Sequence, residues 1–192
     1  MQPLDEEARI VVIGAGQAGG WAAQTLRAEG FGGRLTLIGD ESHRPHERPP
    51  LSKAVLSGAA GVESCYLAKP EVFDALRLDW RPGTRVARID RAGNEVQLEG
   101  GERLAYDRLI LCTGGRARGL PMPVAPGANV HALRTVEDAE RLAAELCPGA
   151  RVAVIGGGWI GLEVAATARQ KGAEVTVIEA QARLCQRAVP ED

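Results

Sequence analysis

The residues best suited to chemistry in this chain are two sets of glycines with the spacing Gly-x-Gly-x-x-Gly. One set is Gly14, Gly16 and Gly19, and the other is Gly156, Gly158 and Gly161. In such a motif the first glycine permits a tight turn, the second lets the backbone approach a pyrophosphate, and the third lets a helix pack against a strand. The free amides and the dipole of the helix N-terminus then favour the anion. Two copies therefore indicate two nucleotides and electron transfer between them.

In a chain with 24 glycines the Gly-x-Gly-x-x-Gly spacing can occur by chance, but the sequence around each motif supports a nucleotide-binding function. Apolar strands are expected at Arg9 to Ile13 and Arg151 to Ile155, directly before the glycines. Each motif then opens a helix and leads to a second strand that ends at an acid, Asp40 or Glu179, about 25 residues after the first glycine. Such an acid accepts hydrogen bonds from ribose hydroxyls and repels a 2′-phosphate, so NAD is favoured over NADP at the second motif.

Two further charged residues are candidates that the sequence alone leaves open. Lys53 ends a segment from Glu41 that is rich in charges and prolines, where we expect no regular structure. A lysine in a loop is more often a solvated charge than a functional group. Glu163 follows the second motif and is expected in the first turn of its helix, where an acid complements the dipole.

The elements that must position these residues predict an α/β fold. The first motif belongs to a doubly wound, Rossmann-like domain with a helix over 18–28 and a strand over 35–38. Short helices are expected at 52–56 and 71–76, an antiparallel meander at 86–89, 95–98 and 103–106, and a helix at 136–146. The unbroken apolar run Leu109 to Cys112 predicts a strand buried on both faces that returns to the parallel sheet.

This organisation divides the chain into three parts. Residues 1–120 are predicted to form the first part of one nucleotide-binding domain, 121–150 a linker and helix, and 151–192 the start of a second Rossmann-like domain. Only 13 residues follow Glu179. We therefore expect a C-terminally truncated chain.

Composition and charge exclude several classes of function. A net charge of −2 in a chain with 45% hydrophobic residues predicts an ordinary globular protein with no basic face for nucleic acid. The polar N-terminus does not resemble a secretory signal, and no apolar run approaches the length of a membrane span. We expect a soluble, cytoplasmic protein without membrane association. The four cysteines, Cys65, Cys112, Cys147 and Cys185, lack the spacing of a metal site or a local redox disulfide.

Five blocks of sequence together resemble a known family. They are Gly14 to Gly19, Arg48-Pro49-Pro50-Leu51-Ser52-Lys53, Leu109 to Gly115, Leu133 to Ala139 and Gly156 to Glu163. The set is similar to the FAD-dependent ferredoxin reductases of oxygenase systems, the group that includes putidaredoxin reductase, rubredoxin reductase and the reductases of aromatic-ring dioxygenases. The resemblance covers essentially the whole chain.

The resemblance implies a role for each matching residue. The ADP part of FAD would be held by Gly14, Gly16, Ala18, Gly19 and Asp40. Further FAD contacts would come from Arg48, Pro50, Lys53, Val86, Thr113, Gly114 and Arg134. NADH would be bound by Gly156, Gly158, Ile160, Gly161, Glu163 and Glu179. The family fold would bring Lys53 and Glu163 together near the reactive part of the flavin, where their ion pair could orient the nicotinamide.

The activity that the resemblance implies is a flavoprotein oxidoreductase of the ferredoxin–NAD(+) reductase type. Electrons would pass from NADH through FAD to a ferredoxin-type iron–sulfur protein, and no cysteine pair near Lys53 offers a disulfide relay. Two alternatives stay open. One is an FAD-dependent NADH oxidase or a reductase like apoptosis-inducing factor, and the other is an inactive dinucleotide-binding fragment.

Overall fold

The computed structural model describes residues 7–191, and these form two compact units. The N-terminal unit consists of residues 7–47 and 66–115, and the C-terminal unit of residues 48–65 and 116–191. The segment 48–65, which carries the Arg-Pro-Pro-Leu-Ser-Lys block, thus leaves the N-terminal unit and packs with residues from the second half of the chain.

The N-terminal unit is built on a four-stranded parallel sheet with the order β3-β2-β1-β7. β1 (Arg9–Ile13) is a central strand and pairs in register with β2 (Arg34–Ile38) on one side and β7 (Arg108–Leu111) on the other. β3 (Asp79–Arg81) extends the sheet beyond β2. Because parallel strands end at one edge, the residues that follow β1, β2 and β7 are brought together there.

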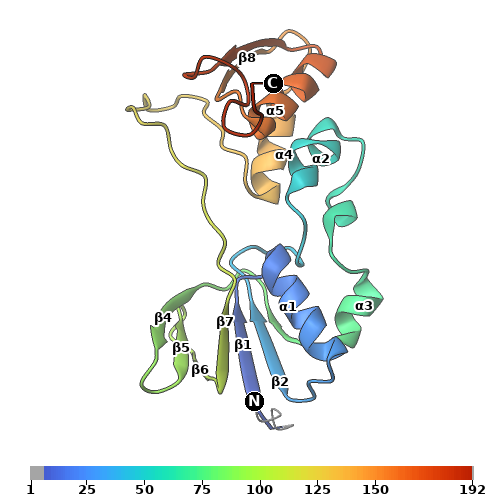
Figure 1. Cartoon of the computed structure of the whole chain (residues 1–192), viewed down its shortest axis with the longest axis vertical. Coiled ribbons are helices and arrows are strands. Elements are labelled where there is room, and N and C mark those ends of the chain that lie inside the picture. Colours follow the sequence, from blue (N-terminus) through green and yellow to red (C-terminus); the bar gives the residue numbers. More distant parts are fainter. Residues whose placement is uncertain (1–6, 192) are drawn as a thin grey trace. The chain divides into compact units, whose positions relative to one another are not determined.

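Alternate side chains of β1 and β2 build two cores. Ile10, Val12, Leu35 and Leu37 pack under the helices α1 (Gln17–Ala28) and α3 (Pro70–Ala75), with Ala23 and Phe73 from those helices. Figure 1 shows both helices on one side of the sheet. Val11, Ile13 and Ile38 face the other way and pack with Val96, Leu98 and Tyr106. The period of two residues in a strand explains why one apolar run feeds both cores.

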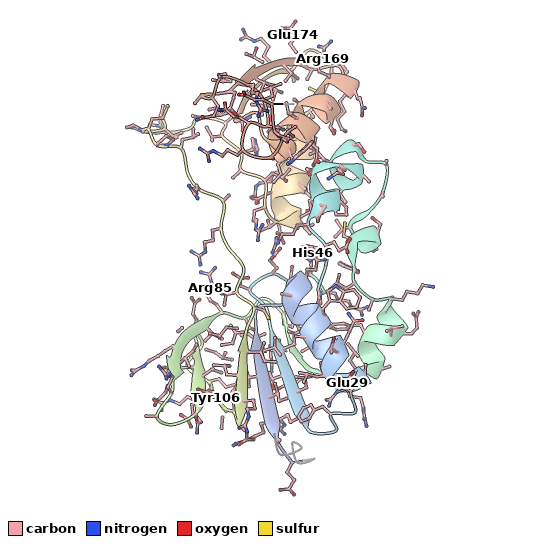
Figure 2. The ribbon with its side chains drawn as sticks, in the orientation of Figure 1. Glu29, His46, Arg85, Tyr106, Arg169 and Glu174 are labelled. Atoms are coloured by element: carbon pink, nitrogen blue, oxygen red, sulfur yellow. The ribbon has the colours of Figure 1, made fainter. Side chains whose placement is uncertain are left out.

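The second core is covered by an antiparallel meander of β4 (Val86–Asp90), β5 (Glu95–Leu98) and β6 (Arg103–Ala105). Val96 and Leu98 are buried on the inner face of β5. Figure 2 labels Tyr106, which follows β6 and is 7% exposed. The meander that the alternating sequence predicted is confirmed.

The C-terminal unit begins a second sheet and packs it against helices. β8 (Arg151–Ile155) and β9 (Glu174–Ile178) form a parallel pair in register, joined by α5 (Trp159–Gln170). Val152, Val154 and Val175 of this pair form a core with residues in or next to two other helices. These residues are Leu142 of α4 (Val136–Glu145), Leu146 directly after α4, and Leu56 of α2 (Ala54–Ser57). Figure 1 shows α2, α4 and α5 side by side. A 3-10 helix, η1 (Pro49–Ser52), precedes α2, and another, η2 (Val62–Cys65), follows it.

Three local expectations need correction. The strand around Leu109 returns to the parallel sheet, but it is not buried on both faces: β7 pairs only with β1 among residues 7–191, and Leu111 is 60% exposed. Pro49 and Pro50 do not exclude regular structure, because proline fits the first positions of a helix and here starts η1. The strand β3 was not expected, since Asp79-Trp80-Arg81 is short and largely polar.

The predicted mixed α/β fold with a parallel sheet is confirmed. None of the helices within residues 7–191 has the length and apolar character that a bilayer crossing requires. The predicted domain limits at residues 120 and 150 stay predictions.

Candidate nucleotide-binding site

The first glycine loop turns directly after β1 and depends on the absence of a side chain at Gly14. Gly14 has φ = +103°, which side-chain-bearing residues rarely adopt, and a Cβ there would lie 2.1 Å from the carbonyl oxygen of Cys112. A Cβ at Gly19 would lie 1.9 Å from the carbonyl oxygen of Gly14. The first and third glycines therefore have the turning and packing functions that the motif predicts.

The second glycine loop has nearly the same backbone. Gly156 has φ = +107°, and a Cβ at Gly161 would lie 2.1 Å from the carbonyl oxygen of Gly156. The surroundings differ, because a Cβ at Gly156 would meet no atom within 4 Å. The turn is thus repeated in both units, whereas the close approach of a neighbouring strand end occurs only at Gly14.

The helices that follow the two loops begin without a side-chain cap. Gly16 and Gly158 are the N-cap residues of α1 and α5, neither makes a side-chain cap, and neither first turn contains an acid. The helix α4 differs, because Thr135 and Asp138 form a capping box and Glu137 adds a second acid. Since free amides at a helix N-terminus attract anions, α1 and α5 keep the arrangement that binds phosphate, and α4 does not.

The two candidate acids are held differently. Asp40 follows β2, and its Oδ2 accepts a hydrogen bond of 3.3 Å from Arg85, which Figure 2 labels. Glu179 follows β9, and its carboxylate accepts hydrogen bonds from the amides of Gln181 at 2.8 Å and Gly157 at 2.7 Å. These amide bonds hold the pKa of Glu179 below its ordinary value. Glu179 is therefore fixed beside the second glycine loop as a charged acceptor.

Lys53 and Glu163, far apart in the sequence, meet within the C-terminal unit. The Nζ of Lys53 lies 2.9 Å from Oε1 of Glu163, and the hydroxyl of Ser52 donates to Oε2 at 2.6 Å. Burial alone would raise the pKa of Glu163, but the hydrogen bonds from Ser52 and Lys53 outweigh it and keep the pKa below the ordinary value. The lysine therefore has a fixed partner in an acid of α5, although its side chain is 53% exposed.

The expectation that Glu163 lies in the first turn of its helix is wrong. Glu163 is the fifth residue of α5, one position past the first turn, so it does not complement the helix dipole there. Its position on α5 instead turns it toward η1.

The remaining candidates divide between the units. Ala18, Val86, Thr113 and Gly114 belong to the N-terminal unit, with Ala18 in α1, Val86 at the start of β4 and the other two after β7. The C-terminal unit contains Arg48, Pro50, Arg134 and Ile160; Nη1 of Arg48 donates to the carbonyl of Arg134 at 2.5 Å, and Ile160 is 55% exposed in the first turn of α5. Four of the residues that the resemblance assigned to FAD, Arg48, Pro50, Lys53 and Arg134, thus belong to the unit that contains the second glycine loop and not the first.

Two neighbours of these candidates were missed by sequence reasoning. Ser52 stands next to Lys53 in the Arg-Pro-Pro-Leu-Ser-Lys block, which is the one signal that could have drawn attention to it. Arg85 precedes the meander and carried no signal for its contact with Asp40. The four cysteines are free thiols, and burial raises the pKa of the Cys112 thiol. Residues 7–191 contain no group of three metal-ligating side chains.

Comparison with known families decides the assignment. The family described as pyridine nucleotide-disulphide oxidoreductase matches residues 8–192. The chain belongs to this family. Its two glycine loops and the parallel strands that precede them are thus features of a pyridine nucleotide-disulphide oxidoreductase.

The curated proteins that the chain resembles include ferredoxin reductases, as the sequence blocks indicated. Over 94% of its length the chain is 48% identical to rhodocoxin reductase of Rhodococcus erythropolis. Over 95% it is 46% identical to the anthranilate 1,2-dioxygenase system ferredoxin–NAD(+) reductase component of Burkholderia cepacia. The reductase in the crystal structure of a covalent putidaredoxin reductase–putidaredoxin complex matches 95% of the chain with 45% identity and a TM-score of 0.88.

The match covers only part of each relative. The chain spans 42% of rhodocoxin reductase, 45% of the Burkholderia reductase and 44% of the reductase in the crystal structure. Less than half of each relative therefore corresponds to residues present here.

Proposed function

We propose that this chain carries the nucleotide-binding half of a flavin-dependent reductase that passes electrons from NADH through FAD to a ferredoxin-type iron–sulfur protein. One observation carries the proposal: the chain contains two glycine loops, each followed by a positioned acid, and its sequence is 46–48% identical to ferredoxin reductases over nearly its whole length. In this proposal the first loop takes FAD and the second takes NADH.

The residues present fit two dinucleotides. Both α1 and α5 offer N-terminal amides behind a tight turn at Gly14 or Gly156, and the second glycines, Gly16 and Gly158, would let the backbone approach a pyrophosphate. Asp40 and Glu179 supply acceptors for ribose hydroxyls. The negative charge of Glu179 disfavours a 2′-phosphate, which supports NADH over NADPH.

The Lys53–Glu163 pair has a positioning role in this proposal. When bound, FAD supplies the chemistry that accepts two electrons together from NADH and releases them one at a time. The protein has to hold the nicotinamide in one orientation. A fixed ion pair beside α5 can do this, because it presents a positive group on Lys53 and a negative group on Glu163. The same proposal includes the further FAD contacts, which would come from Arg48, Pro50, Val86, Thr113, Gly114 and Arg134. It also includes the domain boundaries at residues 120 and 150.

Flavin binding and its reduction by NADH test the proposal. The purified chain, reconstituted with FAD and separated from free flavin, should retain a yellow flavin spectrum. NADH added without oxygen should bleach this spectrum, and an oxygenase-system ferredoxin added next should restore it while the iron–sulfur centre is reduced. Protein that retains no flavin, or whose flavin NADH leaves oxidised, would contradict the proposal for these residues.

A control with oxygen separates the proposed acceptor from the oxidase alternative. Under air and without ferredoxin, NADH consumption should be slow, and ferredoxin should accelerate it. Rapid oxygen consumption that ferredoxin leaves unchanged would favour an NADH oxidase instead.

A further inference from the structure

The ion pair between Lys53 and Glu163 has a third member, the hydroxyl group of Ser52. Ser52 is 5% exposed, and its Oγ donates to Oε2 of Glu163 at 2.6 Å while Lys53 holds Oε1 at 2.9 Å. Each oxygen of the carboxylate thus has its own donor, and the two donors come from consecutive residues of the chain.

The two donors constrain the carboxylate to different degrees. A lysine has a long flexible stem, and the side chain of Lys53 is 53% exposed, so its ammonium group can follow the carboxylate through many rotamers. A serine hydroxyl has one side-chain torsion to its oxygen, and Ser52 is buried. A hydrogen bond from Ser52 to Oε2 therefore restricts the rotation of the Glu163 carboxylate. The ammonium group of Lys53 can then move to reach the other oxygen, Oε1.

The carbonyl oxygen of Pro49 is a second acceptor for both donors. It lies 3.3 Å from Oγ of Ser52 and 3.4 Å from Nζ of Lys53, longer in each case than the contact with Glu163. A serine has a single hydroxyl proton, and the shorter distance directs it to Glu163. If Glu163 moves, both donors can turn to Pro49, so the pair can open without leaving the Ser52 hydroxyl buried and unbonded.

We propose that Ser52 is a positioning residue for the reaction with NADH, whose hydroxyl orients the Glu163 carboxylate toward Lys53, with the Pro49 carbonyl as the acceptor in the open arrangement. The proposal rests on the proposed function, in which the Lys53–Glu163 pair orients the nicotinamide. Ser52 itself touches neither nucleotide in this proposal and acts through Glu163.

The titration of Glu163 tests the contact without any nucleotide. Carbon NMR of the glutamate carboxyl groups would follow the Glu163 resonance, identified by its absence from Glu163→Gln. Ser52→Ala removes a hydrogen bond to the charged form, so the pKa of Glu163 should rise. Ser52→Thr retains the hydroxyl and should restore the original midpoint. Ser57→Ala is the matched control, because Ser57 donates to the carbonyl of Ala54 in the same segment.

The rate of flavin reduction tests the positioning role. In protein loaded with FAD, Ser52→Ala should slow reduction by NADH about fivefold to tenfold, which is the effect of losing one hydrogen bond of about 1 kcal/mol or slightly more. Flavin retention should not change, and Ser52→Thr should recover the rate. Should Ser52→Ala fail to fold, Ser52→Cys keeps a side chain of similar shape and replaces a strong donor with a weak one.

The outcomes separate this inference from the proposed function. An unchanged Glu163 midpoint in folded Ser52→Ala or Ser52→Cys overturns the role of Ser52, and so does an unchanged reduction rate in protein that NADH reduces. Loss of NADH-dependent reduction in the unmodified protein instead rejects the proposed function, while the nucleotide-free titration still reports whether Ser52 controls Glu163.

Discussion

The two glycine loops have almost the same backbone but lie in different surroundings. Gly14 and Gly156 have φ values of +103° and +107°. The strand before Gly14 has a neighbour on each side and is almost completely buried, whereas the strand before Gly156 pairs with β9 alone among the described residues and alternates between exposed and half-buried positions. The turn is therefore encoded by the local sequence, and the burial of the strand before it depends on neighbouring strands.

Alanine at the first glycine should separate the two loops most strongly. Gly14→Ala places a Cβ against the backbone of Cys112 and strains a positive φ, which together should destabilise the N-terminal unit by about 4 kcal/mol. Gly156→Ala meets open space, so only the backbone strain of about 1–2 kcal/mol should remain. Amide hydrogen exchange of β1 and β8 measures each loss.

The third glycines provide the control for this comparison. Gly19→Ala and Gly161→Ala should be similarly disruptive, because a Cβ would lie 1.9 Å and 2.1 Å from a loop carbonyl oxygen. Equal losses for Gly14→Ala and Gly156→Ala would show that the neighbouring strand end does not distinguish the loops.

Truncation of one valine in each strand should give a smaller contrast. Val12 is completely buried between β2 and β7, and Val12→Ala should cost about 2 kcal/mol. Val154 has the corresponding position in β8 but is half-buried, so Val154→Ala should cost about half as much. Urea unfolding of the two variants, followed by hydrogen exchange within each unit, measures the difference. A larger cost at Val154 would mean that β8 is packed more tightly than its exposure indicates.

The smallest contrast concerns the arginines that begin the two strands. Arg9 donates from its backbone amide and its guanidinium to Asp107, and these bonds lower the pKa of Asp107 to about 2. Arg151 has the same position in β8 and pairs with no carboxylate among residues 7–191. Arg9→Gln should therefore weaken the N-terminal unit at neutral pH, while Arg151→Gln should leave the C-terminal unit nearly unchanged.

The contribution of Asp107 should depend on pH in a defined direction. Its pKa in the folded protein is below that of an unfolded aspartate, about 3.9, so its stabilising effect is complete above about pH 4 and is lost as the pH falls through about 2. The stability difference between the unmodified protein and Asp107→Asn should shrink over this range. A difference that stays constant from pH 7 to about pH 2 would show that the charge of Asp107 does not stabilise the folded protein.

The sequence predicted those parts of the fold in which local pattern determines structure. The strands Arg9–Ile13 and Arg151–Ile155 have the expected bounds, because each apolar run ends at a glycine that turns the chain. The exposure of Leu111 could not be predicted, since an apolar strand does not reveal how many strands lie beside it. The short β3 was missed because it has no apolar pattern of its own.

The candidate site followed from the sequence only in part. Spacing identified the glycine loops and Asp40 and Glu179, because a motif and its acid lie close together along the chain. Nothing in the residues alone connects Lys53 with Glu163, and the resemblance to ferredoxin reductases supplied that pairing. The contact of Ser52 with Glu163 needed the structure, because the place of Ser52 in the Arg-Pro-Pro-Leu-Ser-Lys block does not show which group its hydroxyl contacts.

In the proposed function the first loop takes FAD and the second takes NADH. Affinities of the two nucleotides for Asp40→Ala and Glu179→Ala test it most directly. Two control variants make the same change in charge at a neighbouring acid: Glu99→Ala removes another acid that pairs with Arg85, and Glu174→Ala removes the acid at the opposite end of β9, labelled in Figure 2.

The measurement should give a crossed result. Asp40→Ala should weaken FAD about tenfold and leave NADH unchanged, and Glu179→Ala should weaken NADH about tenfold and leave FAD unchanged, because each variant loses hydrogen bonds from one ribose to a charged acceptor. The two controls should bind both nucleotides as the unmodified protein does. An exchange of the two effects, or unchanged affinities in both acid variants, would contradict the assignment of the two loops.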